Sequence, residues 1–369
     1  MSSWNDVRLD EVVELQRGHD LPLKARVEGD IPVLGSNGVV GFHNYPKYSG
    51  PGVTIGRSGV IGGATFTDGP YWPLNTCLFV KDFMGNDPRW VYYWLKSVDF
   101  TALDSGSAQP SLNRNYIASF PVSLPPVQEQ RAIAEVLGAF DDKIAANNAT
   151  AKTSEKLAGS VFDQMSMSLP TVPMSQKLTP ILGGTPNRKK DDFWGGDELW
   201  ASAGDITGAP HSVIADTEEK ITLKAITQTK AKPLPAGGVV ITARGTVGAV
   251  ARLLSPSSFN QSCYGFSPNE LPPSLLYFSV LRAAQRAKSI SHGSVFDTIT
   301  KQTFDHLLMP EFGDVGQRME QQISPLLEFV DARVKENAIL ASLRDTLLPQ
   351  LMSGKLRARD AEAVVEDVL

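Results

Sequence analysis

The chain has 369 residues and a formal net charge of −5 at pH 7. Hydrophobic residues make up 42% of it and charged residues only 20%, which excludes a disordered polypeptide and favours two or three domains with substantial cores. The acidic balance argues against a protein that binds nucleic acid with its whole surface, although local basic patches remain compatible with it.

Residues 1–125 are predicted to form a first globular domain. The N-terminal segment is polar and charged, unlike a signal peptide. Around Gly52 the chain reads GVTIGRSGVIG, in which two β-like runs flank a turn that contains glycines. This pattern predicts a β-hairpin, with glycines supplying positive φ angles. Cys77 follows a polar stretch, and we interpret it as a small buried core residue rather than a reactive thiol.

Residues 126–168 are predicted to form a long helix, because Pro125-Pro126 suits the start of a helix. From Ile133 to Met165 apolar residues alternate in steps of four and three, as at the a and d positions of a heptad repeat. One member of this series is Asn147, and a lone Asn in an apolar seam often fixes the register at a cost in stability. A solvated helix residue is the alternative interpretation.

Residues 169–315 are predicted to be a second copy of the first domain. The segment GVVITARGTVG around Gly238 matches the first hairpin, and the same offset in residue number places Cys263 on Cys77. Asp197–Trp200 matches Asp30–Val33 at a smaller offset, and Gly293-Ser294 matches Gly106-Ser107. The offsets differ, so the loops between the matched blocks are expected to differ in length.

Residues 316–356 are predicted to form a second long helix, followed by a flexible acidic tail over residues 357–369. The apolar series from Ile323 to Leu351 matches the first series position by position, with Asn337 falling on Asn147. Pro325 predicts a kink or a late start of the helix. Gly354 is expected to end it.

These elements predict an α+β protein in which two globular domains in internal repeat are separated by two long helices packed as an antiparallel coiled coil. A helix of roughly 40 residues is about 60 Å long, and no compact domain buries such a rod alone. The pairing of the two helices would hold the domains apart, related by a pseudo-two-fold axis.

The sequence contains no catalytic signature that we could identify. Phosphate-loop, dinucleotide-binding, methyltransferase, metalloprotease and hydrolase motifs are all missing. The two cysteines are too few and too far apart for a disulfide framework or a metal cluster, which fits a reducing, cytoplasmic setting. No metal site is expected, because the histidines lack the spacing of ligands; they are His19, His43, His211, His292 and His306. No apolar run approaches the roughly 18 residues that span a membrane.

Several segments resemble the specificity subunits of Type I restriction–modification systems. Residues 124–131 read LPPVQEQR and resemble the start of the family's central helix, and residues 347–356 read LLPQLMSGKL and resemble the end of its C-terminal helix. Residues 140–144 and 330–334 resemble its paired helix segments. Residues 183–186 (GGTP) with residues 193–197 (FWGGD) resemble the opening of its target-recognition domains. The second half departs from the family's pattern, because it lacks the LPP motif and reads MPEFG over residues 309–313 instead.

The resemblance implies a non-catalytic DNA-sequence specificity subunit that directs adenine methylation and DNA restriction by partner subunits. Double-stranded DNA with a split target site would be its ligand, with one half-site for each domain. Two modification subunits would supply S-adenosylmethionine chemistry and restriction subunits would supply ATP- and Mg-dependent cleavage, while this chain would bind no cofactor. Candidate docking residues lie on the helices; they are Gln130, Arg131, Asp142, Lys143, Arg333 and Lys335.

Polar and basic side chains on glycine-rich loops are the candidates for DNA contact. In the first domain these are Asn37, His43, Asn44, Lys47, Arg57, Ser58, Gln109, Asn113 and Arg114. In the second domain they are Asn187, Arg188, Lys189, Lys190, Arg244, Thr246, Lys301 and Gln302. An ordinary solvated side chain is the alternative interpretation of each.

Two other functions compete with DNA recognition. One is an enzyme fused to a recognition region, which the missing motifs disfavour. The other is a coiled-coil scaffold that spaces two protein- or carbohydrate-binding domains. Salt-independent behaviour on DNA would favour the scaffold.

Overall fold

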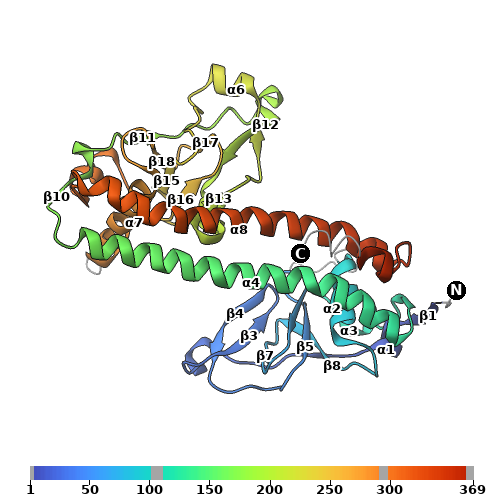
Figure 1. Ribbon diagram of the computed structural model, residues 1–369. Coiled ribbons are helices and arrows are strands. Elements are labelled where there is room, and N and C mark those ends of the chain that lie inside the picture. Colours follow the sequence, from blue (N-terminus) through green and yellow to red (C-terminus); the bar gives the residue numbers. More distant parts are fainter. Residues whose placement is uncertain (1–3, 101–110, 291–297, 363–369) are drawn as a thin grey trace. The chain divides into compact units, whose positions relative to one another are not determined.

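A computed structural model describes residues 4–100, 111–290 and 298–362 of the chain (Figure 1). The chain forms two compact units of mixed helix and strand. Unit 1 consists of Met1–Ile144 and Leu340–Leu369, and unit 2 consists of Ala145–Ile339. The α+β class and the internal repeat are therefore as predicted. The units divide the chain within the long helices, whereas the predicted domain edges lie at the helix ends.

The described residues of unit 1 form three sheets. The first has the order β2-β8-β5-β6, with antiparallel neighbours, and consists of β2 (Glu14–Arg17), β8 (Cys77–Asp82), β5 (Gly52–Gly56) and β6 (Gly62–Thr67). The second has the order β4-β3-β7 and consists of β4 (Gly38–His43), β3 (Ile31–Gly35) and β7 (Trp72–Pro73). The third pairs β1 (Asn5–Arg8) with β9 (Pro121–Leu124). The hairpin predicted around Gly52 is confirmed as β5–β6.

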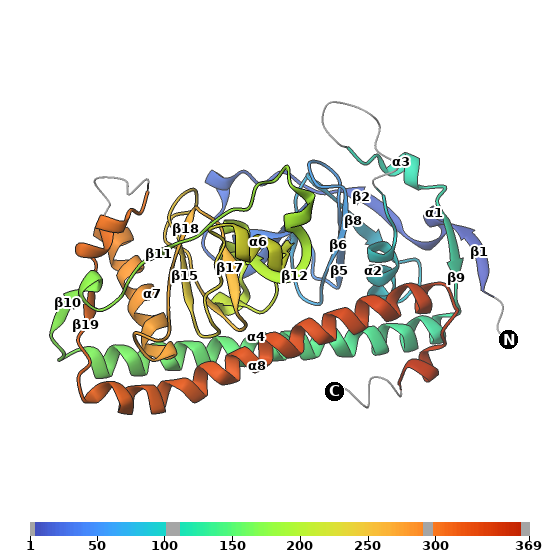
Figure 2. The ribbon, with the colours of Figure 1, turned by 90° about the horizontal axis from the view of Figure 1, so that it is seen from above.

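The core of unit 1 lies between its helices and the first sheet. The helix α2 (Pro88–Ser97) covers β5 and β6 (Figure 2). It begins where the Asp87 carboxylate accepts hydrogen bonds from two backbone N–H groups of its first turn. Trp90 and Trp94 on its apolar face are buried in the same core cluster as Leu137. The short helices are α1 (Leu9–Val12), η1 (Leu23–Ala25) and α3 (Arg114–Ile117).

Unit 2 repeats this arrangement. Its main sheet has the order β11-β18-β15-β16-β13 and consists of β11 (Ile181–Leu182), β18 (Cys263–Phe266), β15 (Val239–Thr242), β16 (Val250–Leu253) and β13 (Val213–Ile214). Its second sheet has the order β14-β12-β17 and consists of β14 (Lys220–Ile221), β12 (Trp194–Ala201) and β17 (Ser257–Phe259). A third sheet pairs β10 (Thr171–Pro173) with β19 (Leu308–Pro310).

Helix α7 (Pro273–Ile290) of unit 2 packs on β15 and β16, as α2 packs on β5 and β6 in unit 1. The remaining helical elements of unit 2 are short and lie in its loops. They are α5 (Ala203–Gly208), α6 (Leu223–Gln228), η3 (Met174–Gln176), η4 (Asp191–Phe193), η5 (Pro210–Ser212) and η6 (Lys301–Asp305).

Equivalent backbone hydrogen bonds occur in the two units, and their donors and acceptors differ in residue number by the same offset that places Cys263 on Cys77. In unit 1 the N–H of Arg57 donates to the carbonyl of Thr76 at 2.9 Å, and in unit 2 the N–H of Ala243 donates to the carbonyl of Ser262 at 2.8 Å. Both donors lie at the end of a hairpin strand, and both acceptors lie just before the cysteine-bearing strand. The two units therefore share one hydrogen-bonding plan.

The smaller sequence offset, which matched Asp197–Trp200 to Asp30–Val33, is explained by strand pairing. Val33 pairs with Trp72 in the parallel β3–β7 ladder, and Trp200 pairs with Ser258 in the parallel β12–β17 ladder. Val33 and Trp200 are related by the smaller offset, whereas their partners Trp72 and Ser258 are related by the larger offset of the hairpins. The match is therefore a real structural equivalence, and the intervening loops absorb the difference.

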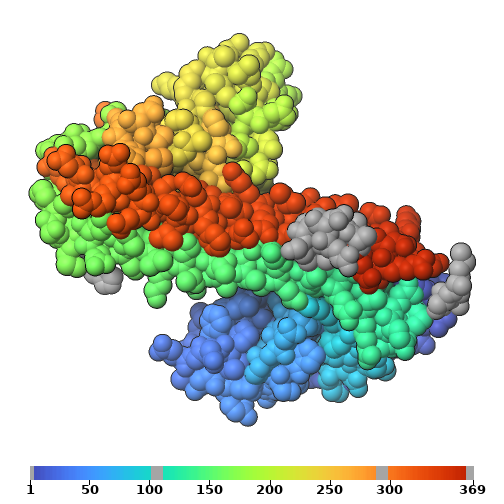
Figure 3. Space-filling model, viewed as in Figure 1, coloured from blue at the N-terminus to red at the C-terminus, as the bar shows by residue number. Residues whose placement is uncertain are grey.

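The two long helices are α4 (Val127–Ser166) and α8 (Val315–Met352), and each contributes to both units. Within unit 2 they lie side by side (Figure 3). Asn147 Nδ2 donates to Asn337 Oδ1 at 3.0 Å, and Ser154 Oγ donates to the carbonyl of Leu326 at 2.9 Å. Ser154 lies later in α4 than Asn147, but its partner Leu326 lies earlier in α8 than Asn337, so the two helices pair in antiparallel fashion.

Two expectations about the ends of α8 have different outcomes. The helix begins at Val315 and continues through Pro325, so the late-start alternative is wrong, while the kink stays a prediction. The expected stop is confirmed: Gly354 has φ 68°, which favours glycine, and the N–H of Leu356 donates to the carbonyl of Gln350. The expected flexible tail is also wrong for residues 357–362, because Ala358 and Ala361 are buried in the core of unit 1. Their spacing of three residues places both on one helical face, which the acidic composition obscured.

Replacing Asn147 and Asn337 together by leucine is expected to stabilise unit 2 by about 1–2 kcal/mol of unfolding free energy. The thermal midpoint of unit 2 should rise accordingly. A polar pair in an apolar seam contributes register at a cost in stability. The single variant Asn147→Leu should gain little, because Asn337 then loses one amide partner. Calorimetry of the three proteins measures this. A double variant that is less stable than the wild type would contradict the expectation.

Both cysteines are buried core residues at equivalent positions, as predicted. Burial raises the pKa of the Cys77 and Cys263 thiols from 9.0 to about 12. Native thiols should therefore resist alkylation at mildly alkaline pH and react fully in concentrated urea, which mass spectrometry can count. Because the raised pKa values favour the protonated native state, their stabilising effect is complete below pH 9 and is lost as the pH rises toward 12. Rapid labelling of the native protein would contradict this.

Candidate nucleic-acid interface

In unit 1 three loops converge on one edge. Ser36 Oγ, in the β3–β4 turn, donates to the carbonyl of Ser58 at 2.6 Å. The N–H of Leu112 donates to the carbonyl of Arg57 at 2.8 Å. Five of the predicted DNA-contacting residues therefore gather here; they are Asn37, Arg57, Ser58, Asn113 and Arg114.

The same edge contains a cavity of about 460 Å³. Arg57, Asn113 and Arg114 line it together with Gln16, Arg17 and Tyr116, which the sequence analysis did not single out. The one available signal was the polar pair Gln16-Arg17 directly before Gly18. Nothing in the local sequence indicated that this strand end meets a loop far along the chain.

A second group of predicted residues lies at the other end of β4. His43 ends the strand and Asn44 and Lys47 follow it, so the six residues of β4 separate them from the Asn37 turn by about 17 Å. Asn44 and Lys47 are exposed, and the Lys47 ammonium lies 5.6 Å from the centre of the Trp72 ring.

His43 does not fit the predicted role of a DNA contact. It is only 8% exposed, and its Nδ1 accepts a hydrogen bond from the N–H of Val27 at 3.1 Å. Its ring also packs edge-on against Trp72 at 5.6 Å. The imidazole therefore joins two segments of the domain, and the expectation is corrected. Gln109 lies outside the described residues.

In unit 2 an equivalent edge carries four predicted residues. Arg244 and Thr246 occupy the turn between β15 and β16, and Lys301 and Gln302 begin η6. The N–H of Ile299 donates to the carbonyl of Ala243 at 2.9 Å, which brings the two segments together. All four side chains are exposed. This bond is the counterpart of the one between Leu112 and Arg57 in unit 1.

The loop with Asn187, Arg188, Lys189 and Lys190 is exposed, but Arg188 is held in place. Its guanidinium stacks 3.9 Å from the centre of the Trp194 ring and donates to Glu219 at 2.7 Å. The hydrogen bond from Arg188 lowers the pKa of the Glu219 carboxyl. Arg188 therefore anchors the loop.

The other three residues of this loop differ in how they are held. Asn187 accepts a hydrogen bond from the N–H of Lys189, and Lys190 lies over the Phe193 ring. Lys189 is the cation of the loop that remains most available to a ligand.

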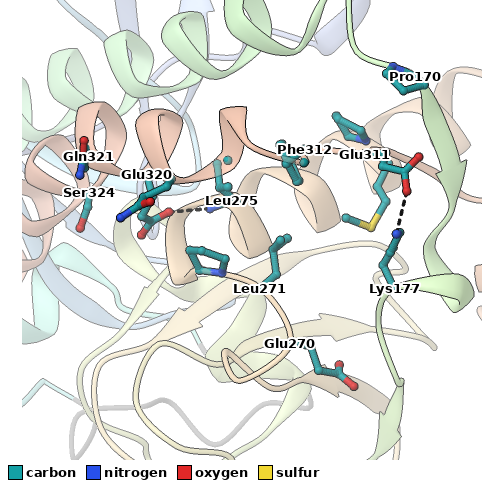
Figure 4. Close-up of a pocket in the computed structure, with 16 residues that line it drawn as sticks. Pro170, Lys177, Glu270, Leu271, Leu275, Glu311, Phe312, Glu320, Gln321 and Ser324 are labelled. Carbon is teal, nitrogen blue, oxygen red and sulfur yellow. Dashed lines mark hydrogen bonds and ion pairs between the residues drawn. The ribbon is translucent and has the colours of Figure 1, made fainter.

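A cavity at one end of unit 2 has the wrong charge for DNA. It has a volume of about 880 Å³ and lies between the starts of α7 and α8 (Figure 4). Glu270, Glu311 and Glu320 line it, and its cation Lys177 is paired with Glu311 at 2.7 Å. Glu320 accepts hydrogen bonds from two N–H groups of the first turn of α7. Carboxylates that surround apolar side chains repel phosphates, so this cavity is excluded as a DNA site.

The helix residues considered for subunit docking are not all free. Gln130 is 1% exposed and belongs to the core of unit 1. Asp142 accepts a hydrogen bond from Arg89 at 3.0 Å, and Arg333 pairs with Glu336 at 2.6 Å. Lys143 also interacts with another residue, whereas the side chains of Arg131 and Lys335 are exposed. The expectation for Gln130 is therefore wrong, since α4 turns this residue inward.

Within residues 4–100, 111–290 and 298–362, no group of three or more histidine, cysteine or acidic side chains could hold a metal ion. None of the helices in those ranges combines the length and apolar character needed to cross a membrane.

Comparison with known proteins identifies one group of relatives. The sequence model of the family described as Type I restriction modification DNA specificity domain matches residues 1–155 and 178–310. The MjaIX Type I restriction enzyme specificity subunit of Methanocaldococcus jannaschii is 27% identical over 165 residues, which cover 44% of this chain and 38% of that protein. The EcoR124I/EcoR124II specificity subunit of Escherichia coli is 25% identical, covering 49% of this chain and 48% of that one. The matched segments thus span less than half the length of these relatives.

A solved structure extends the likeness to the whole fold. The S subunit of a Type I restriction–modification system from M. genitalium superposes with a TM-score of 0.60 and 16% sequence identity. The superposition covers 95% of this chain and 96% of that one. At this identity the likeness concerns the fold alone.

Proposed function

The chain belongs to the Type I restriction–modification DNA specificity family, and we propose that it is a non-catalytic subunit that reads a split DNA target, one half-site with each repeat. The observation that carries this proposal is the pair of equivalent polar edges. In unit 1 the hairpin end is hydrogen-bonded to the segment that carries Asn113 and Arg114. In unit 2 the hairpin end is hydrogen-bonded to the segment that carries Lys301 and Gln302. Exposed basic and amide side chains of this kind suit DNA backbones and base edges.

The long helices are proposed to act as an antiparallel coiled-coil spacer between the two half-sites. One turn of B-DNA is about 34 Å, so a rod of this order can serve half-sites separated by roughly 5 to 8 base pairs. The Asn147–Asn337 contact at 3.0 Å supports a fixed register between the helices. Under this proposal the two asparagines keep both domains at a defined spacing.

Partner subunits are proposed to supply the chemistry. Two modification subunits would bind exposed helix faces such as those of Arg131 and Lys335, and they would use S-adenosylmethionine to methylate adenine after base flipping. Restriction subunits would add ATP- and Mg-dependent cleavage. This chain would bind no cofactor itself, and the complex would act on DNA in the cytoplasm.

Methylation sequencing tests this function directly. The chain is expressed with its modification subunit, and methylated adenines are mapped on a DNA library. A bipartite motif that depends on this chain is expected. The variant Arg244→Ala/Lys301→Ala should lose selectivity in one half-site only. The control Lys220→Ala/Lys224→Ala removes the same charge from unit 2 at residues that pair with Asp216 and Asp192.

Two outcomes would contradict the proposal. Absence of chain-dependent methylation by a complex that demonstrably assembles would favour the scaffold. A loss of selectivity in both half-sites would show that the two units do not read DNA separately. Arg188 is left intact in this design, because its contacts with Trp194 and Glu219 are structural.

A further inference from the structure

Three arginines from separate segments of unit 1 meet in the 460 Å³ cavity. Arg17 ends β2, Arg57 follows β5 and Arg114 begins α3. The cavity is polar, and its lining is completed by Gln16, Leu78, Ser111, Asn113 and Tyr116. It therefore combines three guanidinium groups with amide and hydroxyl donors.

No carboxylate balances these arginines among the described residues. None of the three forms an ion pair there, and no acidic residue lines the cavity. The two acids nearest in sequence to Arg17 are engaged elsewhere, Glu14 with Lys81 and Asp20 with Asn75. Three like charges in one small concavity repel one another, and an anion that binds between them removes that repulsion.

The backbone holds the arginines in place before any ligand binds. The β2–β8 ladder pairs Arg17 with Leu78. The N–H of Arg57 donates to Thr76, and the carbonyl of Arg57 accepts from Leu112. Little backbone ordering is therefore left for binding, which favours a tight contact with a small anion.

The equivalent position in unit 2 has lost this chemistry. The N–H of Gly18 donates to the carbonyl of Cys77, and the N–H of Gly183 donates to the carbonyl of Cys263. Because the two cysteines are equivalent, Gln16-Arg17 aligns with Ile181-Leu182. Ile181 is 40% exposed and Leu182 is 55% exposed. Ala243 stands in the place of Arg57, so only the cation equivalent to Arg114 remains, at Lys301. The arginine cavity is thus a property of unit 1, beyond the shared fold.

We propose that Arg17, Arg57 and Arg114 bind one phosphate group of the DNA backbone and thereby set the register of unit 1 on its half-site; this rests on the proposed function. A duplex phosphate projects outward and can enter a concave site, whereas the edges of stacked bases are reached by side chains that protrude into a groove. Three converging guanidinium groups match the charge and oxygens of a single phosphate. At the equivalent positions unit 2 has Leu182, Ala243 and Lys301, so it keeps one cation of the three and must orient itself through other contacts.

Equilibrium binding of the complex with its modification subunits tests the proposal. Arg17→Ala is expected to weaken binding about fivefold to tenfold on the target duplex and equally on an unrelated duplex. The slope of log K against log salt should fall by about one, and the methylated motif should not change. Arg8→Ala is the matched control, because Arg8 is an exposed arginine of the same unit that pairs with Asp10. It should leave affinity and slope unchanged.

Methylphosphonate substitution identifies the phosphate itself. Neutral phosphates are introduced singly along the first half-site. One position should weaken wild-type binding as much as Arg17→Ala does, and it should have no further effect on that variant. Arg114→Ala is tested in parallel, with thermal unfolding of each variant to show that unit 1 stays folded.

The outcomes separate this proposal from the proposed function. Unchanged affinity and slope in Arg17→Ala and Arg114→Ala, with the motif still read, would exclude the phosphate site and leave the function intact. A loss confined to the target duplex, with relaxed selectivity at one base, would make these arginines base readers instead. Absence of any motif with the wild-type complex would refute the proposed function itself.

Discussion

Replacing Arg252 by alanine is expected to lower the free energy of unfolding of unit 2 by about 3 kcal/mol. Arg252, on β16, is 6% exposed, and its Nη1 lies 2.7 Å from Asp331 Oδ1 on α8. Its guanidinium also lies 5.1 Å from the centre of the Tyr277 ring. Without Arg252 a largely buried carboxylate loses its cation, and the aromatic ring loses a packing partner.

The pH dependence of this variant follows from the pKa of Asp331. Burial raises that pKa above its ordinary value of 3.8, while the charge of Arg252 opposes the increase. Removing Arg252 raises the pKa further, so protonation of Asp331 favours the native variant. The loss of stability should therefore be largest at neutral pH, above the folded pKa, and should shrink as the pH falls through it.

Urea unfolding at neutral and mildly acid pH measures both effects. The double variant Arg252→Ala/Asp331→Ala is the control, because it removes both charges and should recover part of the stability at neutral pH. An equal deficit at both pH values, with no recovery in the double variant, would show that packing rather than charge explains the role of Arg252.

Replacing Gln130 by alanine is expected to destabilise unit 1 by about 2–3 kcal/mol. The Gln130 amide donates to Asn86 Oδ1 at 2.8 Å and to the carbonyl of Pro125 at 2.9 Å. Its oxygen accepts from the N–H of Asp87 at 2.9 Å, just before α2. Alanine would remove the Gln130 partner of three polar groups, of which the Pro125 carbonyl meets it in a buried place and the other two in partly buried places.

The repeat supplies a matched control for this prediction. Glu320 in α8 corresponds to Gln130 in α4 at the offset that places Asn337 on Asn147, and it accepts hydrogen bonds from the N–H groups of Ser274 and Leu275. Glu320→Gln keeps an acceptor and should cost less than about 1 kcal/mol. Gln130→Glu removes the amide donor and buries a charge, and it should cost as much as alanine. Denaturant unfolding of the three variants measures this asymmetry, and equal effects of Gln130→Glu and Glu320→Gln would contradict it.

The sequence by itself determined the repeat and the main elements. Glycine-bearing turns between β-branched runs predicted the hairpins, and steps of three and four residues predicted α4 and α8. The offsets that aligned Cys77 with Cys263 and Val33 with Trp200 reappear as strand pairings. These features depend on patterns within about ten to forty residues, where the periods of helix and strand act directly on side-chain spacing.

Only the tertiary structure decided which side chains meet. It buried His43 and Gln130, which the sequence placed on the surface, and it packed Ala358 and Ala361 into the core of unit 1. It also brought Arg17, Arg57 and Arg114 to one cavity, although long loops separate them in sequence. Such convergence depends on which strands pair and how loops cross between them, and local periodicity carries no information about that.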